Sequence, residues 1–275
     1  MQRQRSGPRR DRAAYSACLA CVLTSATPIL LGGCTPHRDA GVATTATDVR
    51  QVGLEADDAV RRMSDFLGNQ SQFRVEAEIV NEQLDAAGYR IQYSDFTTIE
   101  VARPNMLRAT IDGDRLSRRV WYNGKSVSVL DTEQNCYSVV DAPSDIDAML
   151  DHMVTNYGAG APVADVIVNQ VYDSLMRNVV TGSYVGLHRV GTWQCHHLAF
   201  SQPSIDWQIW IENSDTPFPR RLTIVYKNNP ARPMYMATFA RWDTTANLAP
   251  GDFEFQPPAD ARQVPMEPRD TSAGQ

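Results

Sequence analysis

Two hairpin signals most constrain the fold of this chain. Asp112-Gly113 and Asn123-Gly124 are dipeptides typical of two-residue β-turns, because both central positions of a type I′ turn need positive φ. Counting outward from these turns places Arg118 opposite Leu107 and Val129. One face of the resulting sheet is then almost wholly apolar: Leu107, Ala109, Ile111, Leu116, Val120, Tyr122, Val127 and Val129. The sequence therefore predicts an antiparallel meander with one dry face.

Helical and extended periods divide the rest of the chain. Apolar residues at 3.6-residue spacing predict helices over 49–67, from Ser144 to Tyr157, and from Pro162 to Met176. Extended segments are predicted at 75–79, 89–96, 98–102, 136–140, 184–189, 193–200, 205–212, 220–227, 234–242 and 253–255. Together they predict an α+β fold: a strongly curved antiparallel sheet that forms an incomplete barrel, with helices covering the open side.

The first 34 residues resemble the export and acylation signal of bacterial lipoproteins. Five arginines precede an uncharged segment, 13–31, and Leu31-Gly32-Gly33-Cys34 follows the pattern of a lipoprotein cleavage site. A permanent transmembrane helix is the alternative, but hydroxyl residues and Pro28 dilute the segment below the apolar content of a spanning helix. Cleavage before Cys34 would allow acylation of its thiol, with palmitate as one such chain, and several chains anchor a protein stably.

The resemblance also implies a location and a domain plan. A membrane-anchored lipoprotein on the periplasmic side is expected, and Thr35 favours the outer membrane by analogy with enterobacterial sorting. We expect a signal peptide at 1–33, a flexible tether at 34–48, a single domain at 49–258 and a loose C-terminal tail at 259–275.

Charge excludes one class of partner. Residues 1–33 hold five arginines and one aspartate, so their removal changes the formal net charge from −6 to −10. The phosphates of nucleic acids need a basic surface, and this chain has no stripe of lysine and arginine. Nucleic acid is therefore not an expected partner.

Two cysteines remain in the expected domain. Cys136 and Cys195 could form a disulfide in an oxidising compartment, or they could be two buried free thiols on separate strands. The run Cys195-His196-His197 invites a metal or thiol-catalysis interpretation. On a strand, however, His196 points away from its two neighbours, so the three side chains cannot converge on one ion. No catalytic residue, metal site or cofactor is predicted.

Several short segments resemble one protein family. They are Ser183-Tyr184-Val185-Gly186, Cys195 to Phe200, Asp206-Trp207-Gln208-Ile209-Trp210-Ile211-Glu212, Pro219-Arg220-Arg221-Leu222 and Phe253 to Pro258. From about Val49 to Ala261 the chain resembles the DUF2092 family of predicted periplasmic proteins. That family is similar in outline to the LolA and LolB lipoprotein carriers and to the amino-terminal part of the RseB and MucB regulators. The resemblance implies an incomplete barrel with an apolar cavity under its helices, and no established reaction.

The candidate cavity residues come from the predicted strand faces. They are Arg118, Val120, Val129, Trp207, Ile209, Ile211, Met234 and Met236. Arg118, the one charge on the dry face of the meander, either anchors a ligand carboxylate or phosphate, or pairs with an acidic residue. The apolar residues either line an open cavity or fill an ordinary core.

The leading hypothesis is a non-catalytic, lipid-anchored envelope protein that binds an apolar ligand, the acyl chains of a lipid or lipoprotein, in the cavity. The alternative is a sensor or scaffold that docks another envelope protein through the curved sheet. An enzyme that uses Cys195 or a histidine is the least favoured hypothesis.

Overall fold

The computed structural model describes residues 51–160 and 162–269. The predicted signal peptide (1–33), the acylation site at Cys34 and the tether (34–48) lie outside the described residues. Across the described part of the chain, no helix is both long and apolar enough to cross a membrane.

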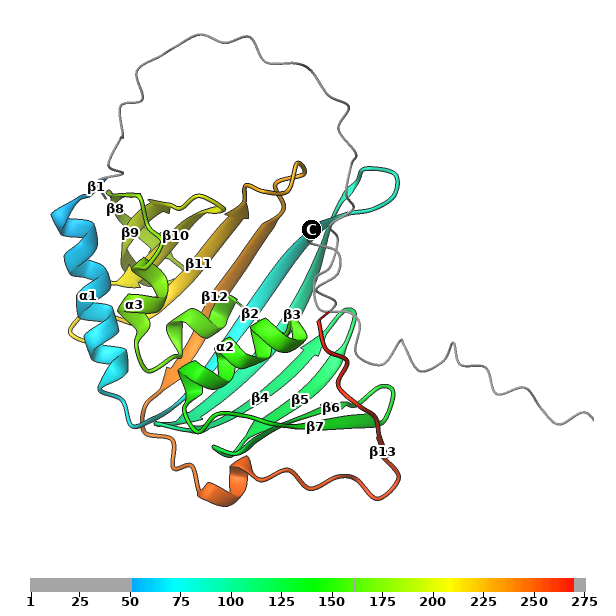
Figure 1. Cartoon of the computed structure of the whole chain (residues 1–275). Coiled ribbons are helices and arrows are strands. Elements are labelled where there is room, and N and C mark those ends of the chain that lie inside the picture. The colour runs from blue at the N-terminus through cyan, green and yellow to red at the C-terminus, as the bar shows by residue number, and fades with distance from the viewer. Residues whose placement is uncertain (1–50, 161, 270–275) are drawn as a thin grey trace, which may run out of the picture.

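The fold is α+β, with one large, mostly antiparallel sheet and three α-helices (Figure 1). The thirteen strands have the spatial order β1-β8-β9-β10-β11-β12-β2-β3-β4-β5-β6-β7-β13. Their bounds are β1 (Gln51–Val52), β2 (Gln72–Leu84), β3 (Arg90–Ala102), β4 (Met106–Gly113), β5 (Ser117–Tyr122), β6 (Ser126–Asp131), β7 (Cys136–Asp141), β8 (Thr181–Val190), β9 (Trp193–Ser201), β10 (Ile205–Glu212), β11 (Pro219–Tyr226), β12 (Met234–Asp243) and β13 (Arg262–Gln263).

Two meanders make up this sheet. Strands β2 to β7 form one and β8 to β12 the other, and the antiparallel pairing of β12 with β2 joins them. The sheet departs from the predicted antiparallel pattern at its edges, because β1 pairs with β8 and β13 pairs with β7 in parallel. Each of these outer strands has two residues and comes from an end of the described chain.

The hairpin turns lie later in the chain than the sequence predicted. Between β4 and β5 the turn centres on Asp114 and Arg115, because Asp112 pairs with Ser117 and the Gly113 backbone N–H donates to the Leu116 carbonyl over 3.0 Å. The next turn is wider, since Asn123 Oδ1 accepts from the backbone N–H groups of Lys125 and Ser126, each at 3.1 Å. Both corrections shift the pairing by an even number of residues, so every predicted face assignment in the meander is confirmed.

The three α-helices and η2 pack against one face of the sheet, whereas η3 lies on the other face (Figure 1). Their bounds are α1 (Leu54–Gly68), α2 (Ile146–Tyr157) and α3 (Val171–Met176), with the short 3₁₀ helices η2 (Pro162–Val166) and η3 (Pro250–Phe253). The predicted single helix from Pro162 to Met176 is therefore two pieces, η2 and α3. The predicted extended segment 253–255 begins instead at the end of η3.

One connection crosses the whole sheet. Strands β7 and β8 are consecutive in the chain but lie near opposite edges of the sheet, so residues 142–180, which carry α2, η2 and α3, run from one edge to the other. The start of α2 is anchored to the sheet: Asp145 caps it, Ile146 N–H donates to the Pro104 carbonyl over 3.2 Å, and Tyr122 Oη donates to the Pro143 carbonyl. Burial raises the pKa of Tyr122 to about 12.

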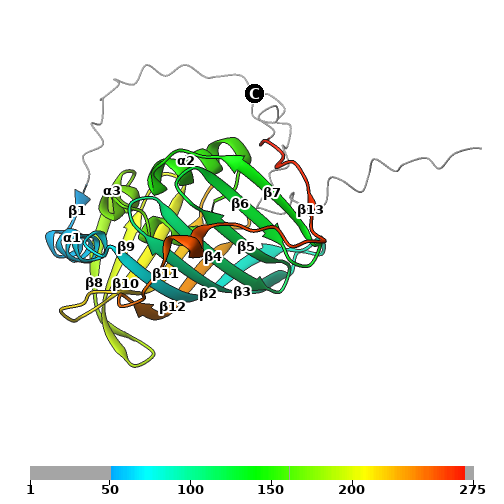
Figure 2. The same cartoon turned by 90° about the horizontal axis from the view of Figure 1, so that it is seen from below.

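The C-terminal segment covers the other face of the sheet. Figure 2 shows it running from η3 past β4, β5 and β6 to β13. Leu248 and Phe253 pack on Ala102, and the Phe255 ring lies 4.9 Å from that of Trp121. Val264 is buried, and its carbonyl accepts from Ser138 Oγ over 2.6 Å. The domain therefore extends beyond residue 258, and the expected loose tail does not begin there. We call residues 244–264 the strap.

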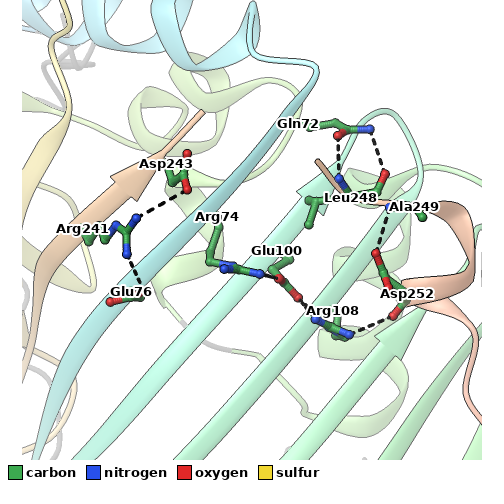
Figure 3. Close-up of polar contacts among 10 residues, drawn as sticks. All are labelled: Gln72, Arg74, Glu76, Glu100, Arg108, Arg241, Asp243, Leu248, Ala249 and Asp252. Atoms are coloured by element: carbon green, nitrogen blue, oxygen red, sulfur yellow. Dashed lines mark hydrogen bonds and ion pairs between the residues drawn. The ribbon is translucent and has the colours of Figure 1, made fainter. Parts of the chain in front are cut away.

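A buried ion cluster lies beside the start of the strap (Figure 3). The Glu100 carboxylate is almost fully buried and accepts from Arg74 Nε over 2.9 Å and from Arg108 Nε over 2.5 Å. Arg108 also reaches the Asp252 carbonyl in η3, at 3.4 Å. Gln72 holds the Leu248 backbone through two hydrogen bonds. These polar contacts tie the strap to β2 and β4.

Candidate functional site

The candidate site is the apolar face beneath the helices. Strand alternation directs one set of side chains from both meanders toward α1, α2, η2 and α3. Typical members of this set are Phe73, Val75, Ile99, Leu107, Val127, Leu198, Ile209, Leu222, Ala237 and Phe239, all of them buried. The helices contribute mainly aliphatic and methionine side chains in return, among them Val60, Met63, Met149, Met153, Val171 and Leu175. This face, called the covered face below, is continuous from β9 to β7.

Five of the predicted cavity residues lie on the covered face, in two groups. Val120 on β5 is directly opposite Val129 on β6, and both are partly exposed. Trp207, Ile209 and Ile211 on β10 are fully packed in the core. For these three residues of β10 the filled-core alternative describes the structure, whereas the valine pair lies where the core is less complete.

Arg118 is also on this face, but it faces a carboxylate. In the actual register its neighbours across the strands are Ile111 and Asp131 rather than Leu107 and Val129. Arg118 Nε lies 3.9 Å from Asp131 Oδ2, and both side chains are nearly buried. This arrangement matches the alternative in which Arg118 pairs with an acidic residue.

Met234 and Met236 are not part of the covered face. On β12 the buried residues are Tyr235, Ala237 and Phe239, and strand alternation places the two methionines on the opposite side of the sheet. Met236 pairs there with Val80 and Thr223. The sequence prediction was wrong because both sets of side chains on β12 are largely apolar, so alternation alone could not choose the inner one.

Several buried polar side-chain atoms among the described residues have no hydrogen-bond partner, and two of those on the covered face share one row. The Trp207 indole Nε1 is one of them, and the Tyr235 hydroxyl faces the backbone of Val163 without making a well-formed hydrogen bond. Each residue is 3% exposed. Trp207 lies opposite Ile224, which lies opposite Tyr235, so the three form one row across β10, β11 and β12. The sequence did not single out Tyr235, because its polar atom is visible only once the face of β12 is known.

A half-buried carboxylate lies near the same row. Asp165, on η2, accepts a hydrogen bond from Ser174 Oγ over 2.7 Å and acts electrostatically on Tyr226 and Tyr235. Burial raises the pKa of Asp165 above its ordinary value, more than the Ser174 hydrogen bond and Arg177 lower it. The carboxylate is thus held in a region that disfavours negative charge.

This shift predicts a pH dependence of stability. Because the folded pKa of Asp165 is raised, the folded chain binds a proton that the unfolded chain has already released, and stability falls as the pH rises from the ordinary carboxyl pKa through the folded one. Asp165→Asn removes this loss while Oδ1 can still accept from Ser174. We expect the urea midpoint of the variant minus that of the wild type to increase as the pH is raised from about 4 to about 7. A constant difference between the two proteins would contradict the assignment.

The cysteine and histidine run does not form a metal site. His196 points to the covered face, where its Nδ1 lies 3.1 Å from Tyr184 Oη, while His197 on the other face stacks on Trp210 at 4.1 Å. His197 Nε2 contacts Gln208 Oε1 at 2.8 Å and its Nδ1 contacts His188 Nδ1 at 2.9 Å. Among the described residues, no three His, Cys, Asp or Glu side chains gather as a metal would require.

The predicted disulfide between Cys136 and Cys195 is not formed. Cys195 is a free, buried thiol on β9, and eight strands separate it from β7, which carries Cys136. Burial first, and Glu212 second, raise the pKa of the Cys195 thiol, which disfavours the thiolate that a nucleophile needs.

Two pockets lie beside α1, at the margin of the covered face. The larger, of about 600 Å³, is lined by Glu55, Asp58, Arg61, Arg62, Tyr184 and His196. The smaller, of about 350 Å³, shares Arg62 and His196 and extends to Glu212 and Asp215. The larger pocket is lined mainly by charged side chains, which do not suit an acyl chain, whereas the smaller one mixes charged residues with apolar ones such as Phe66 and Ile211.

Comparisons with known proteins identify one family and several structures of similar fold. An uncharacterized conserved protein from Thermus thermophilus is 12% identical, with 77% of this chain and 99% of that chain covered and a TM-score of 0.46. Lipoprotein LppX from Mycobacterium tuberculosis is 11% identical, with 71% and 98% covered and a TM-score of 0.44. A LolA superfamily protein from Nitrosomonas europaea is 9% identical, with 73% and 97% covered and a TM-score of 0.37.

No curated protein matches the chain. The family model described as "Predicted periplasmic protein (DUF2092)" matches residues 56–267, which is most of the sequence. This protein therefore belongs to the DUF2092 family of predicted periplasmic proteins.

Proposed function

We propose that this protein is a lipid-anchored protein of the bacterial envelope that binds acyl chains of a lipid or lipoprotein under its helices, without catalysing a reaction. The anchor would be Cys34, and the outer membrane is the proposed location. The observation that carries the proposal is the connection at 142–180, which spans a continuous apolar face from one edge of the sheet to the other.

The topology leaves room for this cover to move. In the described part of the chain the edge strands β1 and β13 do not pair with each other, so the sheet stays open, as an incomplete barrel would. The helical cover is attached firmly at the start of α2 through Asp145 and Ile146, while Gly158, with φ of +64°, and Gly160 separate α2 from η2. Short helices joined in this way can shift over an apolar face without breaking sheet hydrogen bonds.

Ligand binding would have to displace part of the cover. Trp207, Ile209 and Ile211 already pack in the core, so an acyl chain would replace helix contacts rather than fill an empty cavity. The affinity would come from apolar surface removed from water, at about 25 cal/mol per Å² before the costs of association. We place the chain beside Val120 and Val129, where the covered face is less completely buried.

Lipid extraction tests the proposal directly. The protein is exported in a bacterial host and purified in a detergent whose mass differs from that of natural lipids. Extraction with organic solvent should then release an acyl-bearing molecule at near-stoichiometric yield. An unrelated lipoprotein, exported and purified in the same way, serves as the control for carry-over. A lipid yield no higher than that of an unrelated exported lipoprotein would count against the proposal.

A second candidate function is docking of another envelope protein. Two observations favour docking. The larger pocket beside α1 is lined mainly by charged side chains. The strand and helix that border it, β8 and α1, also carry exposed apolar side chains: Leu54, Val185 and Leu187. Crosslinking in intact cells separates the two functions, because a stoichiometric protein partner without bound lipid would favour docking.

A further inference from the structure

Trp207 Nε1 and the Tyr235 hydroxyl are the starting point. A buried donor without a partner costs about 1–3 kcal/mol, and native proteins contain few of them. Here two such donors share one row of the covered face, with the single side chain of Ile224 between them. Both belong to inner strands of the sheet, β10 and β12. The other buried atoms without a partner among the described residues, such as Thr97 Oγ1, lie outside this row, so the row is where an acceptor from outside the chain would satisfy two donors at once.

The surroundings of the two donors are apolar. The Phe200 ring stacks on Trp207 at 4.3 Å, and Ile224 and Ala237 are buried beside Tyr235. The cover over this row comes from η2 and α3: Val163 of η2 faces Tyr235, and the Leu175 carbonyl of α3 accepts from Gln202, close to the end of β9. A ligand group that meets these donors must therefore be attached to a hydrocarbon chain.

The charges nearby determine which acceptor fits. Asp165 on η2 and Asp95 on β3 both act on Tyr235, and Asp95 shares the covered face because it pairs with Ile79. Burial raises the pKa of both carboxyl groups more than Arg177 and Arg115 lower it. The cation on the same face, Arg118, is paired with Asp131. A carboxylate or phosphate would be repelled here, whereas an uncharged carbonyl oxygen would not.

We propose that the row Trp207–Ile224–Tyr235 binds the ester carbonyl of an uncharged acyl lipid, with the indole N–H and the phenol O–H as donors. This inference rests on the proposed function and specifies its ligand class. An ester carbonyl has two lone pairs on an otherwise apolar chain, so it satisfies the donors and keeps its tail on the covered face.

A matched series of ligands tests the proposal. The exported, purified protein is titrated calorimetrically with 1-monopalmitoylglycerol, with 1-O-hexadecylglycerol, which differs in lacking the carbonyl, and with palmitate. Two hydrogen bonds of about 0.7 kcal/mol each should make the ester bind about tenfold tighter than the ether. Palmitate should bind more weakly than the ester.

The variant Tyr235→Phe separates a ligand contact from a structural role. It should lower the affinity for the ester about threefold, by loss of one hydrogen bond, and leave the affinity for the ether unchanged. In the ligand-free protein it should not lower the urea midpoint, because the hydroxyl that it removes has no good partner. Tyr89→Phe, at a tyrosine that is 69% exposed, is the matched control and should change neither value.

The outcomes are distinguishable. Equal affinity for ester and ether, or tightest binding of palmitate, would overturn the ester site while leaving acyl-chain binding intact. If Tyr235→Phe destabilised the protein and left the ester affinity unchanged, the hydroxyl would be hydrogen-bonded to the backbone of Val163. That result would also overturn the ester site. If none of the three amphiphiles binds, the proposed function itself fails.

Discussion

Replacing Phe253 with alanine should lower the free energy of unfolding by about 3 kcal/mol, the low end of the range for a buried phenylalanine. Phe253 is 1% exposed and forms, with Leu248 and Ala102, the small core that holds the strap to the sheet. The loss is placed at the low end because a cluster under a surface segment can relax more than a central core. Urea unfolding followed by tryptophan fluorescence measures it.

Phe255 provides the comparison for Phe253. Its ring contacts Trp121 and Tyr137, with centroids at 4.9 and 5.2 Å, but the residue is only partly buried. Phe255→Ala should therefore cost about 1 kcal/mol, close to the value of one aromatic pair. If Phe253→Ala were no more destabilising than Phe255→Ala, the strap would not be anchored by its small core.

Glu100→Gln should be the second most damaging change, at about 2 kcal/mol. The substitution keeps the shape but removes the charge that faces the guanidinium groups of Arg74 and Arg108. Breaking a fully buried ion pair costs about 3–5 kcal/mol. The expected loss is smaller here because the two arginine side chains are 40% and 33% exposed and can gain water.

Glu76 provides a matched control for Glu100. Glu76 lies 3.9 Å from Arg241, and these side chains are 43% and 63% exposed (Figure 3). Glu76→Gln should change the free energy of unfolding by less than about 0.5 kcal/mol, as exposed pairs usually do. Equal urea midpoints for the two variants would mean that burial of Glu100 contributes nothing.

The sequence predicted most helices and strands of this fold, because each of these elements has its own period of apolar residues. The residues of the central meander face as predicted, even though Asp114 and Asn123 shape the turns differently from the expected two-residue form. The side chain of Asn123 hydrogen-bonds to the backbone two and three residues on, and this widens the loop. Turn chemistry of this kind changes the register by two residues without changing the faces.

The order of the strands in the sheet could not be predicted from the sequence pattern. Nothing in the spacing of apolar residues indicates that β12 pairs with β2, yet this contact places Cys136 and Cys195 near opposite edges and rules out their bond. The end of the strap, residues 259–264, was assigned to a loose tail because the sequence from Pro257 onward has almost no large apolar residues. A few anchors, Phe253 and Val264 above all, are sufficient to hold the strap.

In the candidate site, too, the sequence predicted local features but not long-range contacts. Alternation correctly placed Val120, Val129 and Trp207 on one face, because each lies on a strand whose two faces differ in polarity. It misplaced Met234 and Met236, since β12 offers no such contrast. The partner of Arg118 depended on the register, and the donors of Trp207 and Tyr235 became visible only with the three-dimensional neighbours of each atom.

Photolabelling tests the central claim most directly. A monoacylglycerol with a diazirine on its acyl chain is bound to the exported protein, irradiated, and mapped by peptide mass spectrometry. We predict labels on the covered face, in the peptides that carry Val120, Val129 and Trp207, and competition by unlabelled monoacylglycerol. Labels confined to the opposite face, around Met234, Met236 or the exposed Phe96, would contradict an acyl-chain site beneath the helices.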